Sequence, residues 1–387
     1  MVLRLHKENL CIKETKASYV LLKDISKTFG SVTAIHELML EIKKGEFFSL
    51  LGPSGCGKTT ILRLIAGLER PDKGSISIGD RVVAGAQWVQ PEKRRIGLVF
   101  QDYALFPHMT VFKNIAFGLT GCSKNELKQK VMELLDMVGL TEMANRYPHE
   151  LSGGQQQRVA LVRALAPSPD VMLLDEPFSN LDADLRAELR TETRRILKEK
   201  GTTAILVTHD QQEAFSLSDR IGVLNNGRLE QVGTPDEIYH RPLSRFVADF
   251  VGRADFVSGR IEEGSIISGI GVFLLTEPLD IKNNDVDIMI RPDDVDFVID
   301  TEGNATIIEA QFLGPQIIYK LLLSTGNVIH SIKTSSRIFP LGSKVRVMVD
   351  PAHIVVFGKD NEAQAFLQTD LVHESLKTKR ETILGQI

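Results

Sequence analysis

The segment at residues 52–59 constrains the fold more than any other part of the sequence, because it carries the pattern Gly-x-x-x-x-Gly-Lys-Thr. The apolar stretch before it, at 46–51, predicts a buried strand. After it, apolar residues recur at i, i+3, i+4 and i+7 from Ile61, which predicts an amphipathic helix that stops near Gly67. A strand, a glycine-rich turn and a helix in this order form the context in which this pattern binds phosphate groups.

Each residue type in this predicted phosphate-binding loop has a chemical reason. Glycine lets backbone N–H groups approach an anion closely, and the helix start directs the positive end of its dipole at it. Lys58 neutralises phosphate charge and Thr59 holds magnesium. A merely structural glycine-rich turn is the alternative, and the flanking strand and helix disfavour it. The residues expected to bind nucleotide here are Gly52, Pro53, Ser54, Gly55, Cys56, Gly57, Lys58, Thr59 and Thr60.

Cys56 inside the loop has two interpretations. The helix dipole could lower the pKa of its thiol and make it reactive, or the residue could be a small space-filler. We favour the second, because nothing in phosphate binding requires sulfur at this place.

Two adjacent acids, Asp175 and Glu176, end the predicted buried strand at 171–174. Carboxylates at the end of a buried strand need a cationic partner, and magnesium is suited to that role. We expect Asp175 in the magnesium shell and Glu176 to position and deprotonate the attacking water. Exposed acids at strand ends are common, so this pair gains its meaning from the loop at 52–59.

Beyond these motifs, the pattern between residues 19 and 252 predicts an α/β domain. Short apolar runs alternate with longer amphipathic segments, which is typical of a parallel sheet covered by helices. A helical block is expected at about 102–165, and the pair Asn226 and Gly227 predicts a tight hairpin near the domain's end. The segment before it, 1–18, is treated as an N-terminal extension.

From residue 253 the hydrophobicity pattern changes to short alternating apolar runs separated by Pro and Gly turns. We predict a small all-β domain at 253–358, a barrel or a sandwich, followed by a polar tail at 359–387. A chain of 387 residues accommodates two to three domains, in line with this division.

Charge and cysteine content narrow the class of protein. The 46 basic and 50 acidic residues give a net charge of -4, so nucleic acid is not expected as a partner. Three cysteines at wide spacings suit a reducing compartment. The charged start of the chain does not resemble a signal peptide, and apolar runs are too short for a spanning helix. We therefore expect a cytosolic chain whose membrane role, if any, comes through partners.

A further motif narrows the class. Residues 151–155 read Leu-Ser-Gly-Gly-Gln and are followed by Gln-Gln-Arg, which resembles the signature of ABC transporter ATPases. Other residues match the family's pattern: Gln101 resembles the Q-loop glutamine, residues 179–182 the D-loop, and His209 the switch histidine. Phe29 stands where the family stacks an aromatic ring on adenine. The resemblance implies a P-loop NTPase cassette with a helical subdomain, with ATP and Mg2+ as its ligands.

The resemblance also implies a role for each matched residue. Catalysis would rest on Lys58, Glu176 and His209, and the metal would be held by Thr59, Gln101 and Asp175. In the family, the signature faces the ATP held by the opposite subunit of a dimer, so two ATP molecules lie between Lys58 of one subunit and the signature of the other. The expected ATP contacts outside the loop are Phe29, Gln101, Ser152, Gly153, Gly154, Gln155 and Asp182.

Membrane partners are implied too. In the family, the region after the Q-loop receives a helix of a membrane subunit, for which Tyr103, Leu105 and Phe106 offer a socket. We thus expect a homodimer at the cytoplasmic face of the inner membrane, bound peripherally to transmembrane permease subunits and linked through them to a solute-binding protein.

The segment 290–295 resembles the appended domain of importer ATPases, which implies an oligomer-binding-like (OB-like) barrel at 253–358 and favours import over export. The ferric-ion group is the one most similar in sequence at 147–158, 164–167 and 176–183. Importers of sulfate, molybdate, polyamines and sugars have the same type of ATPase subunit. A soluble ABC ATPase of DNA repair or translation is a rival, disfavoured by the single cassette and mildly acidic charge. A regulatory C-terminal domain is a further possibility, but His330 and His353 look isolated and are interpreted as structural.

Overall fold

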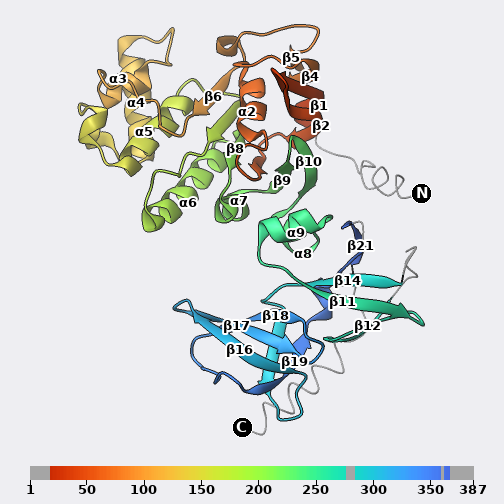
Figure 1. Cartoon of the computed structure of the whole chain (residues 1–387). Coiled ribbons are helices and arrows are strands. Elements are labelled where there is room, and N and C mark those ends of the chain that lie inside the picture. Colours follow the sequence, from red (N-terminus) through yellow and green to blue (C-terminus); the bar gives the residue numbers. More distant parts are fainter. Residues whose placement is uncertain (1–17, 276–283, 359–360, 367–387) are drawn as a thin grey trace. The chain divides into compact units, whose positions relative to one another are not determined.

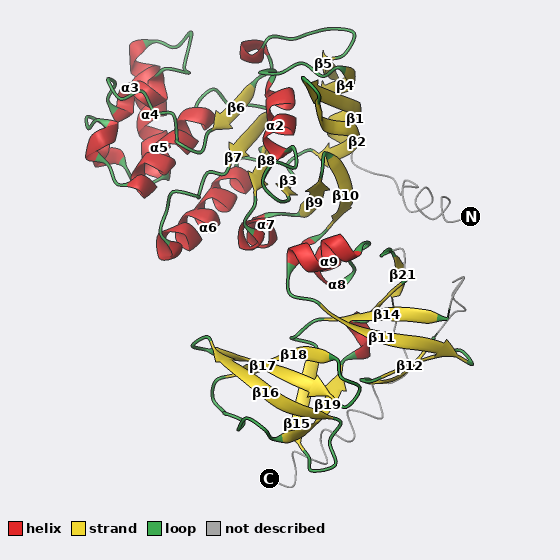
Figure 2. Ribbon diagram, viewed as in Figure 1, coloured by secondary structure: helices red, strands yellow, loops and turns green. Residues whose placement is uncertain are grey.

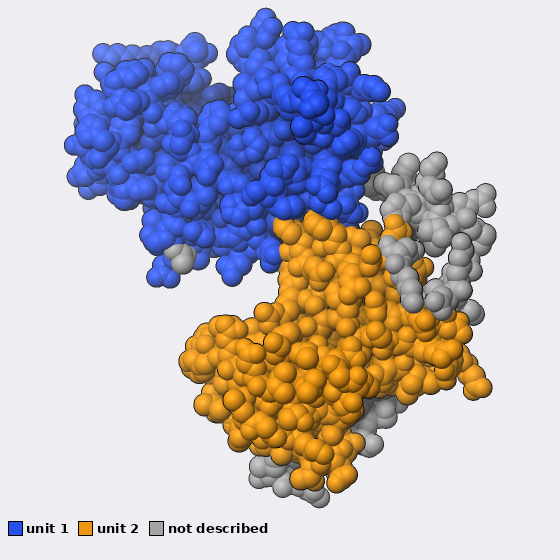
Figure 3. Space-filling view, viewed as in Figure 1, with its two compact units in different colours: residues 1–235 blue, residues 236–387 orange. Residues whose placement is uncertain are grey.

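The computed structural model of the chain describes residues 18–275, 284–358 and 361–366. The chain divides into two compact units (Figure 3), the first ending at Pro235 and the second beginning at Asp236. The predicted N-terminal extension and polar tail lie largely outside the described residues.

The central sheet of the first unit has the order β10-β9-β3-β8-β7-β6, with parallel pairing except between β9 and β10. Side chains of β7 alternate between two cores, Met172 and Leu174 in one, Val171 and Leu173 in the other. Both faces of the sheet are thus buried, which explains the continuous apolar runs in the sequence. Its strands are β3 (Phe47–Leu51), β6 (Ile96–Val99), β7 (Val171–Asp175), β8 (Thr203–Thr208), β9 (Arg220–Asn225) and β10 (Arg228–Gly233).

Helices accompany this sheet (Figure 2), as the predicted α/β class requires. The block predicted at 102–165 is helical, and α3, α4 and α5 gather at one end of the unit (Figure 1). No helix within the described residues combines the length and hydropathy needed to cross a membrane. The helices are α2 (Lys58–Ala66), α3 (Val111–Ala116), α4 (Lys124–Met137), α5 (Gly153–Leu165), α6 (Ala183–Glu199) and α7 (Gln211–Leu217), with short 3-10 turns η1 (Pro91–Lys93), η2 (Thr141–Met143) and η3 (Pro148–Glu150).

An antiparallel sheet of order β2-β1-β4-β5 completes the first unit, and the sequence pattern did not predict it. Its apolar side chains share a core with α2 and the central sheet. The two hairpins β1–β2 and β4–β5 are joined by the long-range pairing of β1 with β4, for example Val20 with Ile78, of which local periodicity carries no sign. The strands are β1 (Ser18–Phe29), β2 (Val32–Lys43), β4 (Lys73–Ile78) and β5 (Arg81–Ala84).

The second unit is β-rich, as predicted, and its described strands form two antiparallel sheets. Their orders are β13-β12-β11-β14-β20-β21 and β15-β19-β16-β17-β18, around a shared apolar core. Its elements are α8 (Pro235–His240), α9 (Arg245–Val251), β11 (Asp255–Glu262), β12 (Ser265–Ser268), β13 (Gly271–Leu274), β14 (Asp285–Ile290), β15 (Val295–Ile299), β16 (Ala305–Phe312), β17 (Gln316–Leu323), β18 (Val328–Thr334), β19 (Lys344–Val349), η4 (Pro351–His353), β20 (Val355–Phe357) and β21 (Ala363–Phe366).

A buried arginine explains why the units divide at Pro235 rather than near the boundary expected at Gly252. Arg291 follows β14 and is fully buried. Its guanidinium donates to the backbone carbonyls of Tyr239 in α8, Ala248 in α9 and Gly252 beyond α9. These charge-assisted bonds tie both helices to the β-rich unit. The functional limits 19–252 and 253–358 stay predictions.

Candidate nucleotide-hydrolysing site

The parallel register brings the predicted catalytic segments to one edge of the central sheet. Leu51 at the end of β3 pairs with Thr208 at the end of β8, and Asp175 at the end of β7 pairs with Val207. The loops that follow β3, β7 and β8 carry the phosphate-binding pattern, Glu176 and His209 respectively. In open α/β sheets, ligands bind at this carboxyl edge.

Lys58 is the first residue of α2 and is buried, with 5% of its surface exposed. Its ammonium group donates to the carbonyl oxygens of Gly52 at 2.8 Å and Pro53 at 2.9 Å. A third contact reaches Sγ of Cys56 at 3.8 Å. These bonds curl the loop around the lysine, so a concentrated positive charge lies within the turn.

Two glycines allow this loop to form. Gly57 has φ of +108°, and a Cβ there would lie 2.7 Å from the carbonyl oxygen of Ala34. A Cβ on Gly52 would lie 2.3 Å from the carbonyl oxygen of Leu224. Larger residues would therefore push the loop away from the neighbouring strands.

Thr59 and Asp175 meet across the loop and β7. The hydroxyl of Thr59 donates to Oδ1 of Asp175 at 3.3 Å. Burial raises the pKa of the Asp175 carboxyl, and the bond from Thr59 opposes that rise. Hydroxyl and carboxylate oxygens are the ligands that Mg2+ prefers, so the two residues fit a magnesium ion.

Glu176 has a strained backbone, with φ of +44°. A non-glycine residue in this region costs about 1–3 kcal/mol and persists where its surroundings hold it. Its N–H donates to the carbonyl of Val207 at 2.9 Å, and its carbonyl accepts from the hydroxyl of Ser179 at 3.0 Å. The turn is thus held on both sides, which sets the direction of the Glu176 carboxylate.

His209 approaches that carboxylate. Nδ1 of His209 lies 3.1 Å from Oε1 of Glu176, while the histidine side chain is 56% exposed. Both residues line a small pocket of about 90 Å³ together with Ser179, Arg186, Thr208, Asp210 and Glu213. A water in this pocket would lie within reach of a carboxylate and an imidazole, the pair of groups that general acid–base chemistry uses.

An ion network behind this pocket was missed in the sequence. Arg190 in α6 is 7% exposed and donates to Asp210 at 2.9 Å and Glu213 at 3.2 Å. Burial raises the pKa of Glu213, and its other oxygen accepts from the hydroxyl of Thr208 at 2.6 Å. The network fixes the start of α7 next to His209. Its members lie far apart in sequence, so no local pattern reveals it.

The signature residues lie at the start of α5. Ser152 caps the helix and forms a reciprocal pair with Gln155, with bonds of 3.0 and 3.3 Å. A Cβ on Gly154 would lie 2.8 Å from Leu185 in α6, and one on Gly153 would lie 3.4 Å from Leu181. The glycines thus let α5 approach the region after β7 closely.

Asp182 and Gln101 lie beside this region. Asp182 caps α6, accepting from the N–H of Leu185 at 2.9 Å. The carbonyl of Gln101 accepts from the side chain of Asn180 at 3.0 Å. The D-loop therefore contacts both the Q-loop backbone and the neighbourhood of the signature. In the described part of the chain, no hydrogen bond joins Ser152 or Gln101 to the loop at 52–59.

The remaining predicted contacts flank the loop. Phe29 ends β1 with 45% of its surface exposed, and Nζ of Lys27 lies 5.0 Å from its ring centroid. Ser54 and Gly55 are exposed at the loop's tip, and Thr60 is half-buried in α2. Burial raises the pKa of the Cys56 thiol, contrary to the reactive interpretation and in agreement with the space-filling one.

One predicted surface residue is in fact buried. Tyr103 is 5% exposed and packs in the core of the helical part, so it does not line a socket. Arg163 of α5 donates to the carbonyls of Tyr103 and Ala104, both of which have positive φ, and folds this segment inward. Leu105 and Phe106 are half-buried. The Phe106 ring lies 4.7 Å from that of Phe117, which is 62% exposed and was not predicted.

A phosphate-binding loop, strand-end carboxylates and a signature helix on one α/β scaffold define the class: an ATP-binding cassette. The comparisons agree. Residues 35–179 match the ABC transporter family model, and residues 288–357 match that of the TOBE domain.

Curated relatives span the whole architecture. The trehalose/maltose import ATP-binding protein MalK of Thermococcus litoralis is 43% identical over 364 residues, covering 88% of this chain and 97% of that protein. The Fe(3+) ions import ATP-binding protein FbpC of Fusobacterium nucleatum subsp. nucleatum is 43% identical over 352 residues, covering 88% and 93%.

Solved structures match the cassette. The dimeric cassette MJ0796 with ADP and Pi has 35% identity and a TM-score of 0.50, covering 56% of this chain and 98% of that one. CbiO1 of Clostridium perfringens, part of the transporter complex cbiONQ, has 28% identity and a TM-score of 0.54, covering 57% and 91%. The chain belongs to the ABC transporter ATP-binding subunits with a C-terminal TOBE domain, and is the ATPase subunit of an importer.

Proposed function

We propose that the chain hydrolyses Mg2+-bound ATP as a homodimer and couples hydrolysis to solute uptake through separate membrane subunits. One observation carries the proposal: Lys58, the pair of Thr59 and Asp175, and the pair of Glu176 and His209 all lie at the carboxyl edge of one sheet. The dimeric form of the related cassette MJ0796 supports the assembly.

In this mechanism each residue acts in turn on the bound nucleotide. The positive charge of Lys58 and the backbone N–H groups of the loop bind the phosphates. Bound magnesium would neutralise charge that develops on the transferred phosphoryl group, with Thr59, Asp175 and Gln101 as its protein ligands. Glu176 accepts a proton from the attacking water, and His209 orients that carboxylate. Phe29 would stack on the adenine.

The dimer turns this chemistry into motion. We infer that Ser152, Gly153, Gly154 and Gln155 of one subunit face the ATP of the other, with Asp182 nearby. The γ-phosphate would then hold the closed dimer, and its loss would release the interface. Permease subunits at the cytoplasmic face of the inner membrane would follow that movement. After the Q-loop, the apolar side chains that would contact a permease subunit are half-buried Leu105 and Phe106 and exposed Phe117.

Magnesium dependence tests the site. Asp175→Asn removes a charge from the metal shell, so turnover should fall at least about 100-fold, as should turnover of the unmodified chain in EDTA. Asp170→Asn is the matched control, since Asp170 begins the same segment but pairs with the exposed Arg95 at 3.3 Å. Equal turnover of both variants would contradict the metal role of Asp175.

For the solute, we propose ferric ion, because the sequence at 147–158 and 176–183 resembles the ferric-ion group and because FbpC is a relative. A sugar is the second candidate, supported by the MalK relative at the same identity. The chain can be tagged in its own host, purified with its membrane subunits and reconstituted in vesicles. Ferric-loaded binding protein should then raise ATP turnover. A rise with trehalose or maltose instead would replace iron by a sugar.

A further inference from the structure

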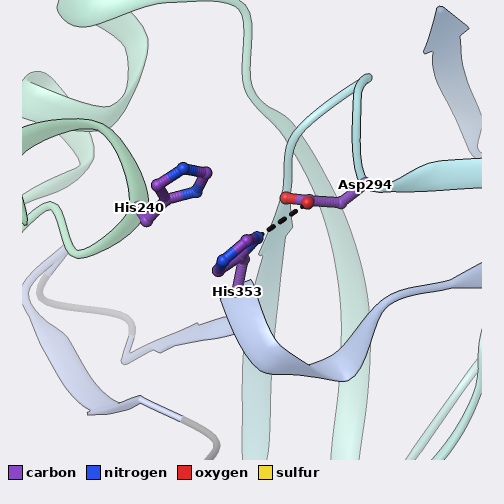
Figure 4. Close-up of side chains that lie close together, drawn as sticks. All are labelled: His240, Asp294 and His353. Atoms are coloured by element: carbon purple, nitrogen blue, oxygen red, sulfur yellow. Dashed lines mark hydrogen bonds and ion pairs between the residues drawn. The ribbon is translucent and has the colours of Figure 1, made fainter. Parts of the chain in front are cut away.

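Three side chains far apart in the sequence come together in the second unit. His240 ends α8, Asp294 lies in the turn between β14 and β15, and His353 ends η4. Figure 4 shows the carboxylate and the two imidazole rings turned toward one small space. One potential ligand atom from each residue lies within 4.8 Å of the others. His353 is therefore not isolated, as the sequence suggested, but lies beside His240 and Asp294. His330, by contrast, pairs with Asp255 at 2.8 Å.

The spacing is close to that of a metal site. Nδ1 of His353 lies 2.8 Å from Oδ1 of Asp294, and the rings of His240 and His353 face each other with centroids 3.9 Å apart. Nitrogen and oxygen ligands lie about 2.0–2.2 Å from zinc, which separates two ligands of a tetrahedral site by about 3.3 Å. The three ligand atoms lie within 4.8 Å of one another, so binding of an ion would draw them closer together.

Unsatisfied polar atoms support a missing partner at this place. Nδ1 of His240 and Oδ2 of Asp294 are both buried and have no hydrogen-bond partner. The Asp294 side chain is only 10% exposed. A buried polar atom without a partner costs about 1–3 kcal/mol, so native folds rarely keep such atoms. A cation bound between them would satisfy both.

The local electrostatics favour a cation. Burial, and then the neighbouring His353, lower the pKa of His240. Burial raises the pKa of Asp294. The carboxylates of Asp236 and Asp293 add negative charge close by.

The shell around the cluster holds its members in place. Tyr239 precedes His240, and its carbonyl accepts two bonds from the buried guanidinium of Arg291, at 2.9 and 3.2 Å. Its hydroxyl donates to Oδ1 of Asp293 at 2.9 Å, next to Asp294. These bonds hold the residues that adjoin His240 and Asp294 in the chain.

We propose that His240, Asp294 and His353 bind one divalent transition-metal ion of the zinc type in the second unit. Two imidazoles and one carboxylate are ligands that zinc accepts, whereas magnesium and calcium prefer all-oxygen sites. The fourth position would be open to water. The ion would connect α8 to the turn before β15 and to η4, and would stabilise the unit by binding only its folded form.

Zinc titration of the full chain tests the site. The purified protein is stripped with a chelator and titrated with ZnCl2 without nucleotide, with zinc per chain read by mass spectrometry and the melting temperature followed in parallel. One zinc per chain and a zinc-dependent rise in melting temperature are expected. His240→Gln, Asp294→Asn and His353→Gln should each weaken binding at least about tenfold, and should remove the rise.

His330→Gln is the matched control, because it removes a histidine of the same unit that is bonded to Asp255. It should bind zinc as the unmodified chain does. Melting curves without zinc identify any cluster variant that fails to fold. The zinc binding of the remaining cluster variants then tests the site. The proposal is overturned if the unmodified chain does not bind zinc, or if binding survives in the folded cluster variants.

Discussion

Nδ1 of His209 lies 3.1 Å from Oε1 of Glu176, across the ends of β8 and β7. Glu176 lies in a strained turn that is hydrogen-bonded on both sides. His209 is followed by Asp210, which is bonded to buried Arg190. The carboxylate thus has an orienting partner on a rigid support, which is the arrangement that proton transfer to a positioned base requires.

Replacing His209 removes that partner. His209→Gln should lower ATP turnover by about 100-fold while leaving ATP affinity almost unchanged, because the imidazole orients Glu176 and does not hold the phosphates. Steady-state hydrolysis and equilibrium nucleotide binding measure the two quantities. His36→Gln on β2 is the control and should behave as the unmodified chain. A large loss of affinity in His209→Gln would show that the histidine binds nucleotide.

Lys58 should govern affinity. Lys58→Ala removes charge-assisted bonds worth about 1.5–3 kcal/mol, so the ATP dissociation constant should rise about 10- to 100-fold. Exposed Lys73 on β4 supplies the control, and Lys73→Ala should bind as before. Calorimetric titration with ATP and magnesium measures the dissociation constant of both variants. Unchanged affinity in Lys58→Ala would place the phosphates elsewhere.

Gly57 should be intolerant of a side chain. Gly57→Ala adds a Cβ at 2.7 Å from two neighbouring atoms as well as the strain of positive φ, so both stability and ATP binding should fall. Gly139→Ala has positive φ but no atom within 4 Å of its Cβ, and isolates the strain alone. Thermal melting should rank Gly57→Ala well below Gly139→Ala. An equal ranking would refute the close packing of the loop.

The buried network at Arg190 should stabilise the first unit. Arg190→Met leaves Asp210 and Glu213 without their shared cation, and breaking a buried ion pair costs about 3–5 kcal/mol. Arg195→Met, which breaks an exposed pair with Glu199, should cost less than about 1 kcal/mol. Urea unfolding gives both free energies. Similar values for the two variants would show that the network is solvated.

Lowering the pH should weaken magnesium binding through Asp175. Burial raises the pKa of its carboxyl, so the group takes up a proton at a higher pH than an ordinary aspartate as the solution is acidified. The protonated form no longer supplies a charge to the metal. Magnesium titrations of the ATP-bound Glu176→Gln chain between pH 8 and pH 5 should show falling affinity. A pH-independent affinity would exclude this coupling.

Local sequence signals predicted local structure well. Asn226 and Gly227 both have positive φ in the hairpin between β9 and β10, which their identity favours. Ser123 and Glu126 form a reciprocal cap at the start of α4, inside the helical block predicted at 102–165. Each of these features depends on residues within a few positions of one another.

Features that depend on distant residues were missed. Arg190 meets Glu213 only because α6 and α7 pack together, and His240 meets His353 only in the folded second unit. The positive φ of Glu176 is set by Val207 and Ser179 around it, since glutamate itself does not favour it. Tyr103 was misplaced on the surface because the apolar residues it packs against are distant in the sequence.

Glu176→Gln tests the central claim most directly, with ATP turnover and size-exclusion chromatography measured on the same sample with magnesium. Loss of the base should lower turnover at least about 100-fold while phosphate binding persists, so the variant should elute as an ATP-dependent dimer. Turnover close to that of the unmodified chain, with no dimer in ATP, would contradict both the role of Glu176 and the proposed coupling through a nucleotide-held dimer.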